Sequence, residues 1–295
     1  MQISRREFLK WSVAAAVALG IEVSLGSVSN VLAAETDPPI IWLQGSGCSG
    51  CTVSTLNVTN PTTIDNVLLN KISMKYNSTL MTASGDLAMQ TLDQSATQYN
   101  GQFILVVEGA VPTGANGNYC VIGEVDGTHL TMEQAVLKYG PMAKYVVAAG
   151  TCASFGGVSA AGANATGCLT ASSLLSGKTV NPVVNLPGCP VHPTVLIQTL
   201  LDLILIGIPS LDRSNRPSNY FGTKIHSMCP RKGTTVVKQL GQYGCYKNVG
   251  CKGPGTQNVC PSMKWNNGQA WCIGVNYPCI GCANPDFPAN PLCKV

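Results

Sequence analysis

Five short apolar runs recur along the first two thirds of the chain, and four of them end in glycine. Runs of this length that are bounded by turn residues predict buried β-strands, because a strand covered on both faces carries apolar side chains at nearly every position. The runs span residues 40–45, 72–77, 103–109, 145–150 and 183–188.

Stretches with helical periodicity separate these runs. Apolar residues recur at helical spacing between residues 87 and 99 and again between residues 132 and 139. Residues 194–207 are apolar nearly all round, which predicts a buried helix. Strands that alternate with helices predict an α/β fold with a parallel sheet, and the loops after the strands should line the edge where such folds bind their ligands.

The character of the chain changes after Pro209. From about Asp212 onward it is rich in Gly, Pro, Asn and Cys and shows little periodicity. A segment of this composition cannot build a large apolar core, so it needs disulfides or metals to hold it together. We therefore predict one domain over residues 35–209 and a second, loop-rich domain over residues 210–295.

The first residues have the features of an export signal. Arg5 and Arg6 stand in a charged segment that is followed by a mildly apolar stretch over residues 11–34, which ends in small side chains. We predict a twin-arginine signal peptide over residues 1–34. This route carries folded proteins, so metal cofactors inserted in the reducing cytoplasm can travel with the chain. The signal thus favours metal ligation over disulfides for most cysteines.

The composition limits the classes of function. Only 11% of residues are charged, whereas about 25% is usual, so a large partner interface or buried inorganic groups should cover much of the chain. The net charge is only +4 and no basic run indicates nucleic-acid binding. Fourteen cysteines stand against three histidines, so the chemistry of the chain should be that of its thiols.

A first set of four cysteines, the proximal set, should gather at one edge of the predicted sheet. Each member follows a predicted strand directly or within a few residues. Four thiolates that converge from separate loops are the usual ligands of a cubane iron–sulfur cluster. The proximal set consists of Cys48, Cys51, Cys152 and Cys189.

Two other motifs overlap the first of these loops. A formal G-x-G-x-x-G begins at Gly45 and is typical of dinucleotide binding. The acidic residue expected at the end of the second strand is missing there, because Asp65 lies well before that strand, and cysteines are foreign to this loop. A thioredoxin-type C-x-x-C is the other interpretation, but it leaves Cys152 and Cys189 unexplained.

Two further sets follow in the loop-rich segment. The distal set begins with an H-x-x-C motif, and its own residues fit zinc and iron–sulfur ligation equally well. The medial set ends in a second C-x-x-C within a glycine-rich stretch. The distal set is His226, Cys229, Cys245 and Cys251, and the medial set is Cys260, Cys272, Cys279 and Cys282.

Three cysteines fall outside these sets. We interpret Cys120, Cys168 and Cys293 as non-ligands, with Cys120 as a small buried apolar residue or as the disulfide partner of Cys168. An even number of cysteines in an exported chain is also typical of disulfide frameworks. A disulfide-stapled exported binding protein without clusters is therefore the alternative function.

Short motifs around the predicted ligands occur in a fixed order from the signal to nearly the C-terminus. They combine the ligands with glycine, proline and neighbouring polar residues. They are Gly47-Cys48-Ser49-Gly50-Cys51, Glu108-Gly109-Ala110-Val111-Pro112-Thr113, Gly150-Thr151-Cys152-Ala153, Pro187-Gly188-Cys189-Pro190, Ile225-His226-Ser227-Met228-Cys229, Gly250-Cys251-Lys252-Gly253-Pro254, Trp265-Asn266 and Cys279-Ile280-Gly281-Cys282.

In this order the motifs resemble the small, electron-transfer subunit of nickel–iron hydrogenases. The resemblance implies a flavodoxin-like first domain that holds a proximal 4Fe–4S cluster, and a second domain around a medial and a distal cluster, with His226 as a distal ligand. Many relatives have proline where this chain has Cys272, and their medial cluster has three irons. A fourth thiolate predicts a medial 4Fe–4S cluster and resembles the nickel–iron–selenium branch. Oxygen-tolerant relatives carry extra cysteines where Gly50 and Gly157 stand, so an ordinary proximal cubane is expected.

The resemblance also implies the partners. Hydrogen is split at a nickel–iron centre in a separate large subunit, and the small subunit carries electrons to an external acceptor, for which we expect a c-type cytochrome. Glu108 is a candidate for the subunit interface or a proton path, or else a hydrogen-bonded acid at a strand end. No apolar stretch of membrane-spanning length follows Cys282, so we expect a periplasmic protein without a C-terminal anchor.

Overall fold

A five-stranded parallel sheet forms the centre of the computed structural model, which describes residues 38–288. The strand order is β2-β1-β3-β7-β9, which is the flavodoxin-like order 2-1-3-4-5. The predicted parallel α/β fold is therefore confirmed, and each predicted apolar run supplies one strand. These strands are β1 (Pro39–Gln44), β2 (Ser73–Asn77), β3 (Ile104–Glu108), β7 (Tyr145–Ala149) and β9 (Val184–Leu186).

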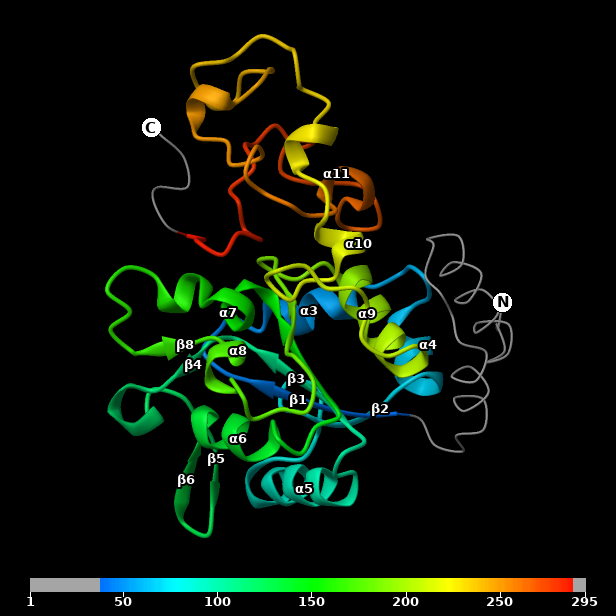
Figure 1. Ribbon diagram of the computed structural model, residues 1–295, viewed down its shortest axis with the longest axis vertical. Coiled ribbons are helices and arrows are strands. Elements are labelled where there is room, and N and C mark those ends of the chain that lie inside the picture. The colour runs from blue at the N-terminus through cyan, green and yellow to red at the C-terminus, as the bar shows by residue number, and fades with distance from the viewer. Residues whose placement is uncertain (1–37, 289–295) are drawn as a thin grey trace.

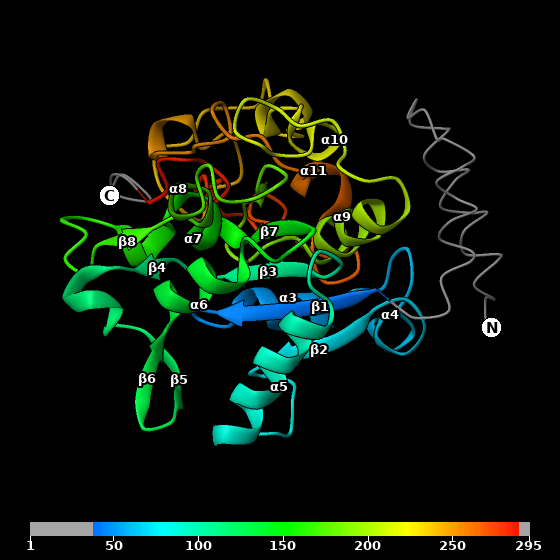
Figure 2. The same cartoon turned by 60° about the horizontal axis from the view of Figure 1, so that its bottom comes forward.

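Helices cover both faces of this sheet, as Figures 1 and 2 show. Alternate residues of one strand enter different cores: Ile40 and Trp42 pack on one face, and Ile41 and Leu43 pack on the other. Continuous apolar strands follow from this double coverage. The first face carries α3 (Gly50–Leu56), α4 (Ile64–Asn70) and α9 (Pro193–Leu205), and the second carries α5 (Gly85–Gln98), α6 (Met132–Tyr139) and α8 (Ala171–Leu174).

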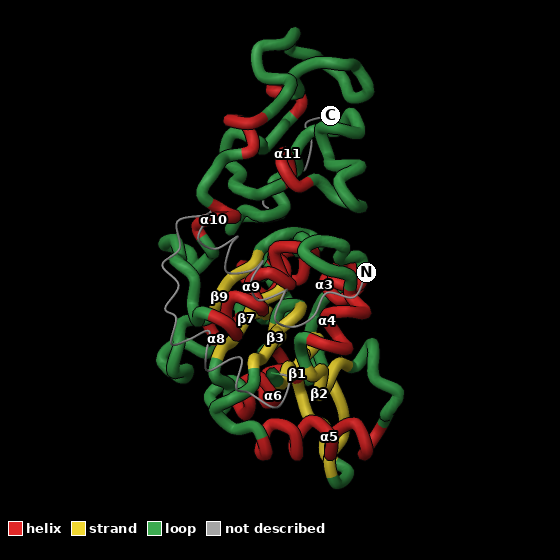
Figure 3. The backbone as a smooth tube through the Cα atoms, turned by 90° about the vertical axis from the view of Figure 1, so that its right-hand side faces the viewer, coloured by secondary structure: helices red, strands yellow, loops and turns green. Residues whose placement is uncertain are grey.

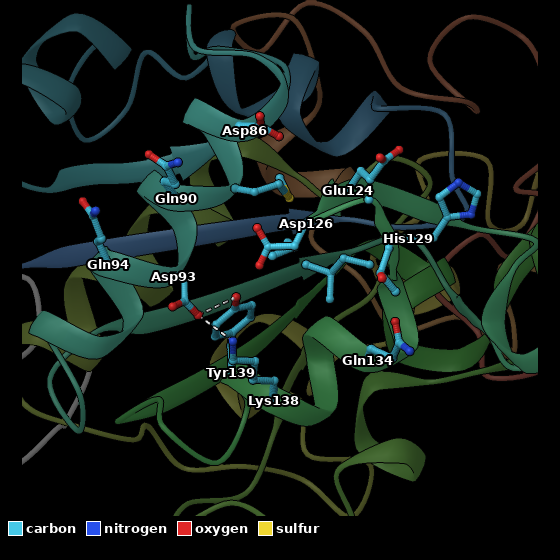
Figure 4. A pocket seen from close by; sticks show the side chains of 15 residues that line it. Asp86, Gln90, Asp93, Gln94, Glu124, Asp126, His129, Gln134, Lys138 and Tyr139 are labelled. Carbon is cyan, nitrogen blue, oxygen red and sulfur yellow. Dashed lines mark hydrogen bonds and ion pairs between the residues drawn. The ribbon is translucent and has the colours of Figure 1, made fainter.

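A β-hairpin that the periodicity did not predict projects beside α5. Its strands are β5 (Val121–Val125) and β6 (Thr128–Thr131), and Asp126 and Gly127 form the turn with φ of 51° and 74°. An Asp-Gly pair with two positive φ values is typical of a type I′ hairpin turn. Together with α5 and α6 the hairpin lines a cavity of about 700 Å³ (Figure 4), and the residues that line this cavity include no cysteine.

The remaining elements of the first two thirds are short. The Thr131 hydroxyl accepts a hydrogen bond from the Gln134 backbone amide and so caps the start of α6. The helix α7 follows β7 without an intervening loop. These short elements position loops rather than add to the sheet. They are β4 (Val111–Pro112), η1 (Gly114–Gly117), α7 (Gly150–Phe155), η2 (Gly157–Ala160) and β8 (Cys168–Leu169).

The segment after α9 consists mostly of loops and lies to one side of the first two thirds of the chain, as Figures 1 and 3 show. Its apolar clusters are small, and the larger of the two is built around Trp271 and Ile273 with cysteines packed against them. The sparse periodicity of its sequence predicted this lack of a large core. Its helical turns are α10 (Ser218–Phe221), η3 (Ile225–Met228), η4 (Lys247–Val249) and α11 (Cys260–Met263).

Two sequence-based predictions fall on residues outside the described range 38–288. These are the signal peptide over residues 1–34 and the assignment of Cys293. Among the helices within residues 38–288, none has the length and apolarity to cross a membrane. The domain boundary near Pro209 stays a prediction.

Candidate metal centres

The proximal set gathers at the carboxyl edge of the sheet. Cys48 and Cys51 flank the start of α3, Cys152 lies in α7 after β7, and Cys189 follows β9. This is the topological switch point of the sheet, where β1 and β3 connect in opposite directions and open α/β folds bind their ligands. The three loops that carry the proximal set are therefore neighbours.

The thiols of the proximal set lie within electrostatic reach of one another. Burial raises the pKa of the Cys51 thiol far above its usual range. The charge of Glu108 raises that pKa further, and so do the thiols of Cys152 and Cys189. Burial, then Cys152 and Cys48, raise the pKa of Cys189. Thiols in such surroundings ionise only when a cation is present to offset their charge, as bound iron does.

Glu108 holds the loop that carries Cys51. Its carboxylate is 2% exposed and accepts hydrogen bonds from the Cys51 amide at 2.9 Å, the Thr52 amide at 3.2 Å and the Trp42 indole at 2.9 Å. The Thr52 hydroxyl donates a fourth bond. The buried side chain is thus a hydrogen-bonded acid at the end of β3, one of the roles that the sequence left open.

Glycines keep the space beside the proximal thiols clear. A Cβ on Gly50 would lie 3.0 Å from the Cys48 Sγ, and one on Gly157 would lie 2.9 Å from the Cys152 Sγ. A Cβ on Gly150, whose φ is 83°, would approach the Cys51 Sγ more closely than either of these. A cradle that even a methyl group would fill, lined by thiols, fits an inorganic group that binds through sulfur.

The medial set forms a second group of neighbouring thiols. Burial, with a smaller contribution from the Cys272 thiol, raises the pKa of Cys260 to about 11 and that of Cys279 to about 12. Burial also raises the pKa of Cys282 far above its usual range, with Cys260, Cys279 and Cys272 adding to the effect. The thiol of Cys272 therefore lies near those of Cys260, Cys279 and Cys282.

Direct contacts join the proximal loops to the medial loops. The Thr151 hydroxyl donates to the Cys282 carbonyl and accepts from the Gly188 amide at 2.8 Å. The Cys189 backbone also hydrogen-bonds the Cys282 thiol and lowers its pKa against the effect of burial. One threonine and one thiol thus connect the ends of β7 and β9 to the last cysteine of the medial set.

The medial loops are in turn adjacent to the distal ones. The Lys252 amide donates to the Cys279 carbonyl at 2.8 Å. A Cβ on Gly253 would lie 3.5 Å from the Cys251 Sγ and 3.8 Å from the Cys279 Cβ. The three sets therefore follow one another in space in the order proximal, medial, distal.

All four members of the distal set line one cavity of about 300 Å³. The buried Arg231 also lines it, and its guanidinium donates to the Asn276 side chain at 2.8 Å and lies over the Tyr243 and Tyr246 rings. Among residues 38–288 no ion pair to Arg231 is found, and residues 213–285 contain no carboxylate side chain. A cavity with three thiols, an imidazole and a buried cation fits an anionic metal cluster.

Two negative findings concern the residues from 38 to 288. No three His, Cys, Asp or Glu side chains are grouped as ligands of a single metal ion. The cysteines of a cubane bind different iron atoms and stand further apart than ligands of one ion, so this finding concerns single-ion sites. Each cysteine from Cys48 to Cys282 also has a free thiol, including Cys120 and Cys168.

Arg231 is a site residue that the sequence did not single out, and Thr151 was noted only as a member of the motif around Cys152. Thr151 directly precedes a predicted ligand, and Arg231 lies two residues after one. Proximity to a ligand was therefore the available signal. The contact of Thr151 with Cys282 spans 131 positions and that of Arg231 with Asn276 spans 45, and no local sequence pattern encodes contacts over such separations.

Two known families match the chain, one in each part. Residues 48–203 match the family described as the 20 kDa subunit of NADH ubiquinone oxidoreductase. Residues 221–293 match the C-terminal region of the NiFe/NiFeSe hydrogenase small subunit. The first family is named for a ubiquinone oxidoreductase, so that match does not by itself indicate a hydrogenase. The second match is specific to hydrogenase small subunits and covers the residues of the medial and distal sets.

Relatives match over nearly the whole length. The chain is 38% identical to the periplasmic [NiFeSe] hydrogenase small subunit of Desulfomicrobium baculatum, over 98% of this chain and 97% of that one. It is also 38% identical to the periplasmic [NiFe] hydrogenase small subunit 1 of Nitratidesulfovibrio vulgaris, over 97% and 90%.

A solved structure agrees in fold as well as in sequence. The recombinant [NiFeSe] hydrogenase from Desulfovibrio vulgaris Hildenborough in the oxidised state superposes with a TM-score of 0.82 at 40% identity, over 88% of this chain and 98% of that one. The cysteine-bearing loops, the sheet order and both family matches lead to the same assignment. The chain belongs to the family of small subunits of nickel–iron and nickel–iron–selenium hydrogenases.

Proposed function

We propose that this small subunit conducts electrons through three 4Fe–4S clusters, between the nickel–iron site of its large subunit and an external acceptor. The observation that carries the proposal is the unbroken series of contacts from the Cys51 loop through Cys282 to Cys251. As a hydrogenase small subunit, the chain is the electron-transfer component of an oxidoreductase that acts on hydrogen, and it pairs with a large subunit.

Each set would hold one cluster, and a bound cluster supplies one-electron oxidation and reduction. The proximal set would ligate through four thiolates on the edge of the sheet. The distal set would ligate through three thiolates and the neutral imidazole of His226, which leaves a lower negative charge than four thiolates would. Hydrogen bonds to sulfur, such as that of the Val191 amide to the Cys51 Sγ at 3.5 Å, are the means by which the chain adjusts each potential.

The medial site should differ from that of many relatives. Cys272 supports a fourth thiolate there, because its thiol lies within electrostatic reach of Cys260, Cys279 and Cys282. Four thiolates favour a 4Fe–4S cluster over a three-iron one. We expect this cluster to have a lower reduction potential than a three-iron cluster in the same place.

Location and acceptor complete the proposal. The twin arginines at Arg5 and Arg6 support export in the folded state, and the named relatives are periplasmic. A periplasmic location makes a c-type cytochrome the expected acceptor. The alternative of a disulfide-stapled binding protein is wrong for this chain, because it belongs to the hydrogenase family and its described cysteines are free thiols.

Metal analysis of the anaerobically purified heterodimer tests the cluster count. Three cubanes require about twelve irons and about twelve acid-labile sulfides per small subunit, together with broad absorbance near ~400 nm. The matched variants are Cys260→Ser, which should lower the iron content, and Cys120→Ser, which should leave it unchanged. Markedly fewer irons in active wild-type enzyme, or equal losses from both variants, would contradict the ligand assignment.

A further inference from the structure

The charge of the chain is divided unevenly between its two parts. Residues 213–285 contain nine lysines and arginines and no aspartate or glutamate, whereas residues 38–209 contain eight acidic residues and five lysines. The modest net charge of the whole chain hides this division. Residues 213–285 therefore carry an excess of positive charge, and Lys224, Lys232, Lys238, Lys247 and Lys264 expose part of it to solvent.

Part of this charge surrounds the distal cavity. Lys232 and Lys247 are exposed and line the cavity together with the buried Arg231. Lys238, in the loop that joins Cys229 to Cys245, is exposed as well. An electron that leaves the distal site would thus emerge beside the positive charges of Lys232 and Lys247.

Large apolar side chains are exposed on the same stretch of chain. Met228, Val236, Leu240 and Tyr243 are 42%, 42%, 45% and 77% exposed, and all four lie between the distal ligands His226 and Cys245. Apolar side chains among charged ones are typical of protein interfaces with an apolar centre and a polar rim. Small interfaces of this kind suit redox partners that associate briefly.

We propose that this basic surface, formed by Met228, Lys232, Val236, Lys238, Leu240, Tyr243 and Lys247, docks an electron-transfer protein whose redox centre is surrounded by acidic side chains. The inference rests on the proposed function, because it concerns the acceptor of the distal site. Opposite charges raise the rate of encounter by about 10- to 1,000-fold and orient the two redox centres toward each other. An anionic membrane would be attracted too, but the lysines that line the distal cavity favour a redox protein.

Two forms of one cytochrome test this inference. The probes are a lysine-rich c-type cytochrome and the same protein after succinylation of its lysines, which makes its surface acidic without replacing the haem. With hydrogen as donor, the heterodimer should reduce the succinylated form with a kcat/KM at least about tenfold higher at an ionic strength of about 0.01 M. The ratio between the two forms should approach one at about 1 M, where charges are screened.

Charge reversal locates the surface. Lys238→Glu and Lys247→Glu should each lower kcat/KM for the succinylated cytochrome and raise it for the native one. Damage to the distal cluster would lower both values together, so the ratio of the two separates docking from cluster loss. The matched control is Lys178→Glu, an exposed lysine in the first two thirds of the chain, and it should leave the ratio unchanged.

Three results would overturn the inference. The first is a higher kcat/KM for the native lysine-rich cytochrome than for the succinylated one at low salt, and the second is a ratio that neither charge reversal changes. The third is release of the Lys238→Glu variant from phosphatidylglycerol vesicles without a change in the ratio, which would assign the surface to a membrane. Failure of the proposed function is distinguishable from all of these, because it would appear as reduction of neither cytochrome by enzyme that still reduces methyl viologen with hydrogen.

Discussion

The Glu108 carboxylate accepts a hydrogen bond from the backbone amide of Cys51 at 2.9 Å, across 57 positions of sequence. This contact ties the end of β3 to the first turn of α3, the element that presents a proximal ligand. The carboxylate is buried, and its four donors are all uncharged. A buried anion held in this way fixes the loop geometry strongly, because every donor would be left unsatisfied without it.

Glu108→Gln should therefore weaken the proximal site. The amide nitrogen of glutamine donates instead of accepting, so it would face donors that the second carboxylate oxygen now satisfies. We expect a loss of roughly 2–4 kcal/mol in the free energy of unfolding and a perturbed proximal-cluster EPR spectrum. The control is Glu124→Gln, an exposed acid on the hairpin. Equal unfolding temperatures and unchanged EPR for the two variants would contradict this role of Glu108.

Thr151 should couple the proximal loops to the medial loops. Thr151→Val keeps the shape but removes the hydroxyl that contacts Cys282 and Gly188, leaving a buried amide and a carbonyl without partners. The expected cost is about 1–3 kcal/mol, seen as a lower thermal unfolding temperature of the heterodimer. Thr151→Ser retains the hydroxyl and should behave like the wild type. If valine and serine are equally stable, the hydroxyl contributes nothing.

Cys272 determines the number of irons in the medial site under our proposal. Cys272→Pro should lower the iron content by about one per small subunit and produce the EPR signal of an oxidised 3Fe–4S cluster at nearly full intensity. Cys168→Ala, which removes a thiol that lies outside all three sets, should do neither. A full-intensity three-iron signal in the unmodified enzyme would show that Cys272 is not a ligand.

Much of this arrangement was accessible from the sequence because two strong signals coincide. The runs that became β1, β3, β7 and β9 are apolar at nearly every position, and proximal cysteines follow three of them. Parallel strands bring such loops to one edge, so the grouping followed from topology. The medial and distal ligands lack a periodic scaffold, so their division into sets rested on the H-x-x-C and C-x-x-C motifs, and the assignment of clusters to them came from the family resemblance.

Other features depend on contacts that local patterns do not encode. The inward direction of Glu108 depends on donors from β1 and α3, whereas the sequence shows only an acid at a strand end. The hairpin with its Asp126-Gly127 turn was missed although the turn pair was visible, because its strands are mostly exposed and lack apolar alternation. The basic surface was overlooked because the net charge averages over both parts of the chain.

Asp202 should make the stability of the chain depend on pH. It lies in the last turn of α9, where burial raises the pKa of its carboxyl group despite a hydrogen bond from Gln198 at 3.0 Å. The C-terminal end of the helix dipole disfavours the same negative charge. Because the folded state holds the proton more tightly than the unfolded state, this group contributes stability at acid pH, below the unfolded pKa of about 3.9, and that contribution is lost as the pH rises through the folded pKa.

Asp202→Asn removes this dependence while keeping the size of the side chain. The variant heterodimer should unfold at a higher temperature than the wild type at pH 8, and the difference should shrink at pH 5, where more of the wild-type carboxyl group is protonated. Asp86→Asn, at an exposed position near the start of α5, is the control and should show no such trend. A difference that grows toward acid pH would mean that Asp202 is stabilised as an anion by contacts beyond Gln198, which would reverse the sign argued from its burial.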